Sequence, residues 1–180
     1  MILPLFRRNA RQDTISTLYG TIVAQARLPC FYREYGVPDT VDGLAFVLDR
    51  LAEDSALRHL GQAIFDLFCK DMDHNLREMG VGDLSVPKEM QRIGEAFYGR
   101  AQAYRAALGA PGGDALAEAL KRNIYGGTPL APGAPALLAA YMREAVRGVR
   151  AQPPDEVLGG KLHLPEPDAL VEDKDKFTED

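Results

Sequence analysis

The sequence has few cysteines, no long apolar run and no excess of basic charge, and each absence excludes a class of protein. Two cysteines in 180 residues, without Cys-x-x-Cys spacing, exclude a disulfide-stapled scaffold and a sulfur-ligated structural metal, and indicate reduced thiols. No stretch approaches the roughly 18 consecutive apolar residues that a transmembrane helix requires. The formal net charge of -5 argues against a specific nucleic-acid-binding protein. With 46% hydrophobic residues, the chain can nevertheless build a core.

The negative charge is concentrated at the C-terminal end. Residues 151–180 contain nine acidic side chains against three lysines, a net charge of -6, so residues 1–150 sum to about +1. The same segment carries proline and glycine pairs and shows no helical stripe. We therefore expect an N-terminal arm over residues 1–12, a helical domain over 13–150, and an acidic, largely irregular tail over 151–180 that packs partly on the body.

Apolar residues recur at intervals of three and four through most of the chain, and glycine and proline separate the segments. We find no set of strands able to build a sheet. The sequence therefore predicts an all-α fold, a single bundle-like helical domain. The expected helices span about 13–27, 40–51, 55–79, 85–108, 114–124 and 135–150.

Three polar side chains interrupt the apolar face of the helix expected over 55–79. At about 100° per residue, Asp71, Asn75 and Glu78 fall inside the stripe that the rest of this helix would bury. Buried polar groups are costly unless they are paired, so these side chains need partners.

The following helix offers such a partner. Arg100 lies at the border of its apolar stripe, and the link over residues 80–83 is short enough to fold the two helices back on each other. We predict a partly buried network in which Arg100 joins the three polar side chains. Gly94 and Ala101 would let the two helix backbones approach closely there.

This network has three interpretations: it fixes the register of two helices, it forms the polar floor of a binding groove, or it binds metal. Asp71 and His74 have the i, i+3 spacing used in di-iron bundles, which need a second pair of the same kind. Neither His59 nor His163 has an acidic residue three positions earlier. We therefore expect no metal and no cofactor.

Aromatic side chains cluster in two segments. By default such residues belong to the core, but a tyrosine cluster at a cleft also suits protein binding. The first cluster contains Phe31, Tyr32 and Tyr35, and the second contains Phe97, Tyr98 and Tyr104.

Three motifs built from these residues resemble the ubiquinol–cytochrome c chaperone family. They are Leu28-Pro-x-Phe-Tyr-x-x-Tyr-Gly-Val-Pro-Asp-Thr40, Phe65-Asp-x-Phe-x-x-Asp-Met-Asp-x-x-Leu-Arg-Glu-Met-Gly-Val-Gly-Asp83 and Ala96-Phe-Tyr-Gly-Arg-x-x-Ala-Tyr104. The similarity extends from about Leu18 to Pro165. One departure is a shorter apolar helix between Gly43 and Asp54 than the family usually has, which changes the shape of any groove beside the motifs.

The resemblance implies a non-enzymatic assembly factor for ubiquinol–cytochrome c reductase that binds newly made cytochrome b. It further implies a small assembly partner, contact with the ribosome, and no cofactor. Because the chain lacks the long leading region of the mitochondrial forms, we expect a bacterial cytoplasmic protein, peripheral to the inner membrane.

The candidate client-binding surface combines the two aromatic segments with the polar row. Two other functions stay open: an enzyme with iron at Asp71, His74 and Glu78, and a helical scaffold for a soluble partner. The candidate residues are Phe31, Tyr32, Tyr35, Val37, Pro38, Asp39, Asp71, Asn75, Glu78, Tyr98, Arg100 and Tyr104.

Overall fold

Helices form every regular element in the part of the chain that the structure describes, which confirms the all-α prediction. The structure is a computed structural model, and it describes residues 3–38, 51, 54–111, 114–126 and 130–170. The helices are α1 (Leu3–Ala26), α2 (Pro29–Arg33), α4 (Arg58–Glu78), α5 (Val86–Gly109), α6 (Asp114–Asn123), α7 (Ala134–Ala151) and α8 (Pro154–Leu158). None of these described helices is long and apolar enough to cross a membrane.

Proline and glycine mark the starts of α5 and α7. Ser85 is the N-cap of α5, and Pro87 lies in its first turn, where a missing N–H costs little. Gly133, at φ +80°, precedes α7 and turns the chain into it just before Pro135. Both predicted starts are therefore confirmed to within a residue.

The first helix starts earlier than predicted. α1 begins at Leu3 and not near residue 13: the prediction relied on the apolar pattern, which begins only at Ile15, and a first turn tolerates Pro4. The tail, predicted to be largely irregular, includes the five-residue helix α8, whose Val157 is fully buried. The helix expected over 40–51 lies outside the described residues except for Leu51, which is buried.

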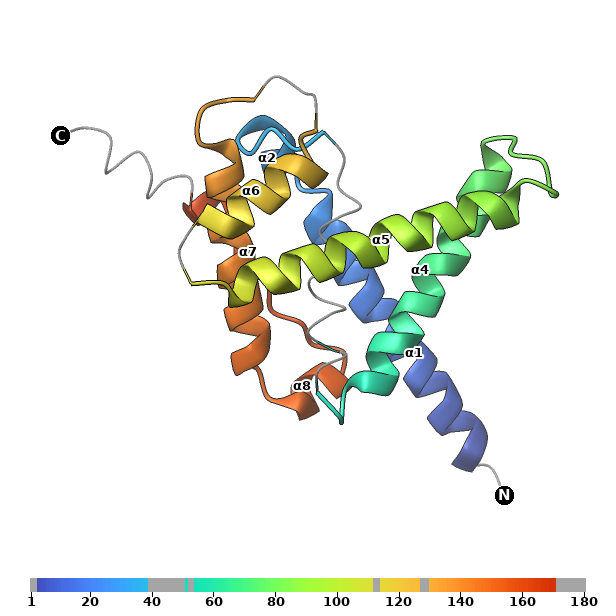
Figure 1. The fold of residues 1–180 in the computed structure, drawn as a ribbon. Helices are drawn as coiled ribbons and strands as arrows, with labels where there is room; N and C mark the ends of the chain where they lie inside the picture. The colour runs from blue at the N-terminus through green and yellow to red at the C-terminus, as the bar shows by residue number, and fades with distance from the viewer. Residues whose placement is uncertain (1–2, 39–50, 52–53, 112–113, 127–129, 171–180) are drawn as a thin grey trace.

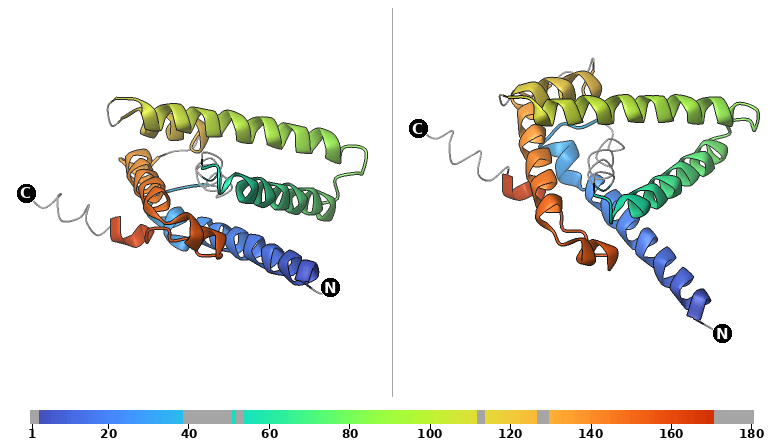
Figure 2. Two further views of the ribbon diagram at one scale, coloured as in Figure 1. Left: turned by 90° about the horizontal axis from the view of Figure 1, so that it is seen from below. Right: turned by 60° about the horizontal axis from the view of Figure 1, so that its bottom comes forward.

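The helices are arranged around an open hairpin. Figure 1 and the right-hand view of Figure 2 show α4 and α5 meeting at one end and diverging from there. α5 runs back to contact α6, which contacts α7, while α4 lies against α1. The joined end of the hairpin therefore projects away from the body that α2, α6, α7 and α8 form.

The core lies where these helices converge, and tyrosines hold the C-terminal segment to it. The Tyr35 side chain is completely buried and donates a 2.8 Å hydrogen bond to the carbonyl oxygen of Pro167. The Tyr125 hydroxyl donates a 2.7 Å bond to the Tyr35 carbonyl oxygen. Gln25 of α1 donates to the Pro165 carbonyl oxygen at 2.8 Å and to the Tyr141 hydroxyl at 3.0 Å. These bonds join residues 90 or more positions apart into one packed unit.

Candidate functional site

The sequence motif Met-Gly-Val-Gly-Asp forms the turn at the projecting end of the α4–α5 hairpin, which we call the hairpin tip (residues 79–85). Gly80 adopts φ +84°, a conformation that favours glycine. Its N–H donates to the Arg77 carbonyl oxygen at 3.0 Å, and the Val81 N–H donates to the Leu76 carbonyl oxygen at 3.0 Å. This pair of bonds is the Schellman pattern, which satisfies the last carbonyls of α4 and stops the helix.

Ion pairs and backbone bonds fix the other side of the tip. Arg77 donates from Nε to Asp73 Oδ2 at 2.8 Å and also contacts Asp83 through Nη1, so one guanidinium joins α4 to the turn. Arg77 holds the pKa of the Asp73 carboxyl below its ordinary value through their hydrogen bond. The Ser85 N–H donates to the Gly82 carbonyl oxygen at 2.7 Å, which leads the chain into α5. The tip is therefore a preorganised turn.

Large apolar side chains are exposed on this rigid hairpin. Leu84 is 99% exposed and Met79 is 73% exposed, although Met79 ends a helix whose pattern predicts its burial. Tyr98, further along α5, is 61% exposed. An apolar side chain gains nothing from water, so exposed groups of this size on an ordered element indicate a contact surface.

An aromatic cluster holds the two helices together below the tip. The Phe65 ring of α4 lies 5.3 Å from the Phe97 ring and 5.5 Å from the Tyr98 ring of α5, measured between centroids. Phe68 also lies 5.7 Å from Phe97. Phe68 and Phe97 are buried, so Tyr98 is the solvent-facing edge of the cluster. Such tilted contacts add to the burial of apolar area and set the angle of the hairpin.

Two members of the polar row have partners outside the predicted network. Asp71 is half-buried and accepts a 2.9 Å hydrogen bond from the hydroxyl of Tyr19 on α1. This bond and burial raise the pKa of the Tyr19 hydroxyl well above its ordinary value, with burial as the larger cause. Glu78 is exposed and pairs with His74 at 3.1 Å, so the prediction that Glu78 lies in a buried network is wrong. Asn75 and Arg100 are half-buried, on α4 and α5 respectively.

The predicted close approach of the two helices at Gly94 is also wrong. A Cβ atom placed on Gly94 would meet no other atom within 4 Å among the residues described. α4 and α5 still touch farther from the tip, through large side chains such as Phe65 and Phe97, and Gly94 is not part of that contact.

The remaining candidate residues divide into buried and exposed groups. Tyr32 and Pro38 are exposed, whereas Asp39 lies outside the described residues. The buried ones belong to the core and support the surface from beneath. They are Phe31, Tyr35, Val37 and Tyr104.

The hairpin tip is the part of the surface that sequence reasoning missed. Met79 fitted the apolar stripe expected to be buried, and Leu84 was not among the candidate residues. The available signal was a short glycine-rich turn flanked by two large apolar residues, because connecting turns run over the protein surface.

The ionisable side chains give no sign of an activated nucleophile. Burial raises the pKa of the Cys30 thiol to about 12, and a hydrogen bond to Asp168 contributes, so the thiol is protonated at neutral pH. Burial likewise raises the pKa of the Cys69 thiol. Within the described ranges, no three His, Cys, Asp or Glu side chains are grouped so that they could hold a metal ion.

Comparisons with known proteins agree on one family. The family model described as ubiquinol-cytochrome C chaperone matches residues 33–164. The crystal structure of the Cbp3 homolog from Brucella abortus is similar to this chain, with a TM-score of 0.81 and 39% sequence identity over 93% of this chain and 98% of that chain. No curated protein matches the chain. The matched range contains the hairpin, the second aromatic segment and Tyr35 of the first, and the chain belongs to the ubiquinol–cytochrome c chaperone family.

Proposed function

We propose that this protein is a non-enzymatic assembly chaperone that binds newly made cytochrome b and supports assembly of ubiquinol–cytochrome c reductase. The observation that carries the proposal is the exposure of large apolar side chains on a rigid, projecting hairpin in a chain of the chaperone family. A membrane protein that is not yet assembled exposes apolar segments, and a chaperone must cover them reversibly.

The hairpin has the physical properties that reversible covering requires. Its tip is already ordered by the Gly80 turn and the Arg77 ion pairs, so little conformational entropy is lost when a client binds. Met79 supplies a flexible side chain that adapts to different apolar surfaces. The exposed pairs Asp73–Arg77 and His74–Glu78 stand beside it and keep the surface soluble between clients.

The other candidate residues complete this surface. Tyr98 extends it along α5, where an aromatic ring with a polar end suits the rim of a protein contact. The half-buried Asp71 and Asn75 on α4 and Arg100 on α5 supply polar groups that orient the client. Tyr32 and Pro38, on and just after α2, form a second exposed contact.

We place the protein in the bacterial cytoplasm, peripheral to the inner membrane, where cytochrome b is inserted. Work with a small assembly partner and contact with the ribosome follow from the same proposal. Its family membership and the absence of a spanning helix among the described residues are consistent with this location.

The test uses a strain that lacks this gene and carries either the intact gene or a variant. Membranes are compared by their reduced-minus-oxidised haem spectra and by ubiquinol–cytochrome c reductase activity. The intact gene should restore the b-type signal and the activity. The double variant Met79→Ser, Leu84→Ser removes two exposed anchors worth about 1–2 kcal/mol each, so client affinity should fall about tenfold or more and the signal should drop.

The control is Leu158→Ser, which removes an exposed apolar side chain on α8, at the other end of the molecule from the hairpin tip. It should restore the signal fully. Equal restoration by the hairpin variant and the control would contradict the proposed surface. An unchanged spectrum in the strain without the gene would contradict the proposed function itself and favour a scaffold for a soluble partner.

A further inference from the structure

A strap of chain crosses the body after α8. Residues 159–170, which we call the strap, run back alongside α7 (Figure 1). Gly160, at φ +86°, turns the chain out of α8 in a conformation that favours glycine. A Cβ atom added to Gly160 would lie 3.9 Å from the Thr14 side chain of α1, and one added to Gly148 of α7 would lie 3.9 Å from the His163 carbonyl oxygen. The strap therefore lies against both α1 and α7.

The first half of the strap is held by one amide side chain. Gln152, at the end of α7, donates from Nε2 to the Lys161 carbonyl oxygen at 3.0 Å and accepts at Oε1 from the His163 N–H at 3.2 Å. A side-chain amide that bonds one C=O and one N–H of a chain replaces the edge of a neighbouring strand. Both bonds are exposed to solvent, so this half of the strap is the part that opens first.

The second half is held by side chains of two other elements. Gln25 of α1 donates to the Pro165 carbonyl oxygen at 2.8 Å, and Tyr35, just after α2, donates to the Pro167 carbonyl oxygen at 2.8 Å. The bonded backbone groups thus belong to every second residue, which is how an extended chain presents one edge. They are those of residues 161, 163, 165 and 167.

Apolar side chains of the strap enter the body beside these bonds. Leu162 is 7% exposed, Leu164 is half-buried and Pro167 is fully buried, whereas His163 is exposed. Only the carbonyl groups of Pro165 and Pro167 are bonded, so the N–H that proline lacks is not needed. Backbone bonds on alternate residues and apolar side chains seated between them are the contacts with which a protein groove holds an extended peptide.

We propose that the surface beneath the strap is a binding groove for an extended segment of a partner protein, and that the strap occupies this groove until such a segment displaces it. Every chain has the backbone groups that Gln25, Tyr35 and Gln152 bond. The partner segment needs an apolar residue followed by proline three and five residues later, as Leu162 is in the strap. Gly160 supplies the hinge from which the strap swings out.

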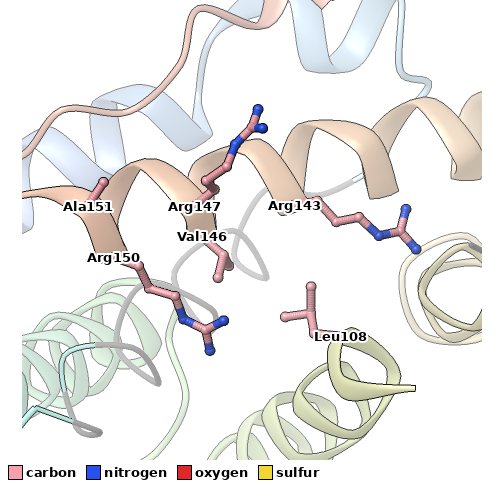
Figure 3. Close-up of a pocket in the computed structure, with 6 residues that line it drawn as sticks. All are labelled: Leu108, Arg143, Val146, Arg147, Arg150 and Ala151. Carbon is pink, nitrogen blue, oxygen red and sulfur yellow. The ribbon is translucent and has the colours of Figure 1, made fainter. Parts of the chain in front are cut away.

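The groove is separate from the pocket on the other helix contact of α7. That pocket, of about 490 Å³, lies on the side of α7 that faces Leu108 of α5 (Figure 3). Its arginines Arg143 and Arg150 already interact with other groups of the chain. None of the three side chains that bond the strap is among its described lining residues. Binding of a partner segment therefore replaces the strap and leaves this pocket as it is.

The experiment measures fluorescence anisotropy of a labelled peptide with the sequence of residues 159–170, titrated with the full chain. Because the strap already fills the groove, the intact chain should bind the peptide weakly. Leu162→Ser loosens the strap but leaves the peptide unchanged, so the affinity for the peptide should rise about tenfold. The matched control Leu158→Ser changes a leucine that is 45% exposed on α8 and should alter the affinity by less than about twofold.

Two further arms test the contacts themselves, in the Leu162→Ser chain. A peptide with Ser in place of its first Leu should bind about tenfold more weakly. Adding Gln25→Met removes the donor to the Pro165 carbonyl oxygen and should lower the affinity by about threefold to tenfold. Adding the control Gln62→Met, which changes an exposed glutamine bonded to Asp66 on α4, should not.

Circular dichroism verifies the fold of each variant, and Leu164→Ser replaces Leu162→Ser if that chain is unstable. The proposal is overturned if a folded strap variant does not bind the peptide, or if Leu158→Ser raises the affinity equally. A dimer in light scattering without peptide binding would also overturn it, in favour of exchange of the strap between two copies. The hairpin tip and cytochrome b take no part in this measurement, so its outcome is independent of the proposed function.

Discussion

Removing the hydroxyl of Tyr35 should loosen the C-terminal segment from the body without disturbing the core. The hydroxyl donates a 2.8 Å bond to the Pro167 carbonyl oxygen, and both residues are fully buried. In Tyr35→Phe the ring keeps its neighbours Phe31, at 5.1 Å between centroids, and Tyr141, at 6.1 Å. The Pro167 carbonyl loses this donor in a buried position, which costs about 1–3 kcal/mol.

For a chain of this size, a loss of about 2 kcal/mol lowers the melting temperature by about 4–8 °C. Urea unfolding followed by circular dichroism measures the free energy, and hydrogen exchange should show faster exchange of the amides near residues 161–170. The control Tyr98→Phe removes a hydroxyl from a 61% exposed ring and should change stability by less than about 0.5 kcal/mol. If Tyr35→Phe unfolds at the same urea concentration as the Tyr98→Phe control and the intact chain, the Tyr35 bond does not hold this segment.

Three other predictions test the core and the hairpin. Gly94→Ala should stabilise the protein by about 0.5–1 kcal/mol in urea unfolding, because the added methyl group meets no neighbour and alanine favours a helix; a loss would indicate a hidden contact. Cys30 is buried and the pKa of its thiol is about 12. At pH 8 a thiol reagent should therefore label Cys30 at least about a hundredfold more slowly in the native chain than in the unfolded chain. Similar labelling rates would show that the site opens. Burial raises the pKa of the Tyr125 hydroxyl to about 12. In the unfolded chain the pKa of a tyrosine hydroxyl is about 10. The higher pKa in the folded chain therefore contributes stability that is complete below pH 10 and is lost between pH 10 and 12, at about 1.4 kcal/mol per pH unit. Urea unfolding from pH 8 to 11 should show this decline, and Tyr125→Phe should make it shallower.

The elements that the sequence predicted well are those that local signals define. Pro87 and Pro135 mark helix starts and Gly80 marks a helix end, because each acts through the backbone of its own turn. α1 was predicted too short, since its first turns carry no apolar periodicity and only periodicity had been used to find it.

The contacts that were missed join residues far apart in the chain. Asp71 pairs with Tyr19, 52 residues away, and Tyr35 with Pro167, 132 residues away, and no local spacing encodes either bond. Glu78 was placed in a buried network because the apolar stripe of α4 was assumed to be covered along its whole length. The hairpin projects beyond the body, so Glu78 at the end of α4 is exposed, although Leu76 in the same turn is buried.

The sequence predicts only part of the candidate surface, because the exposure of its side chains depends on contacts between distant residues. The motif that contains Asp71 and Gly80 indicated the region in which the exposed side chains of the hairpin lie, because its composition is unusual for a plain helical pair. Which side chains of that region are exposed depends on the angle between α4 and α5. The contacts of Phe65 with Phe97 and Tyr98 set that angle, and they are tertiary.

The most direct test of the central claim is a cross-linking measurement with newly made cytochrome b. A photoreactive amino acid is placed at position 84 on the hairpin tip or, as the control, at position 158 on α8, both exposed apolar positions in the intact chain. Illumination during synthesis of cytochrome b should yield a cross-linked product from position 84 and little from position 158. Equal amounts of cross-linked product from both positions would contradict the account. So would the absence of product from position 84 in a chain that still restores ubiquinol–cytochrome c reductase.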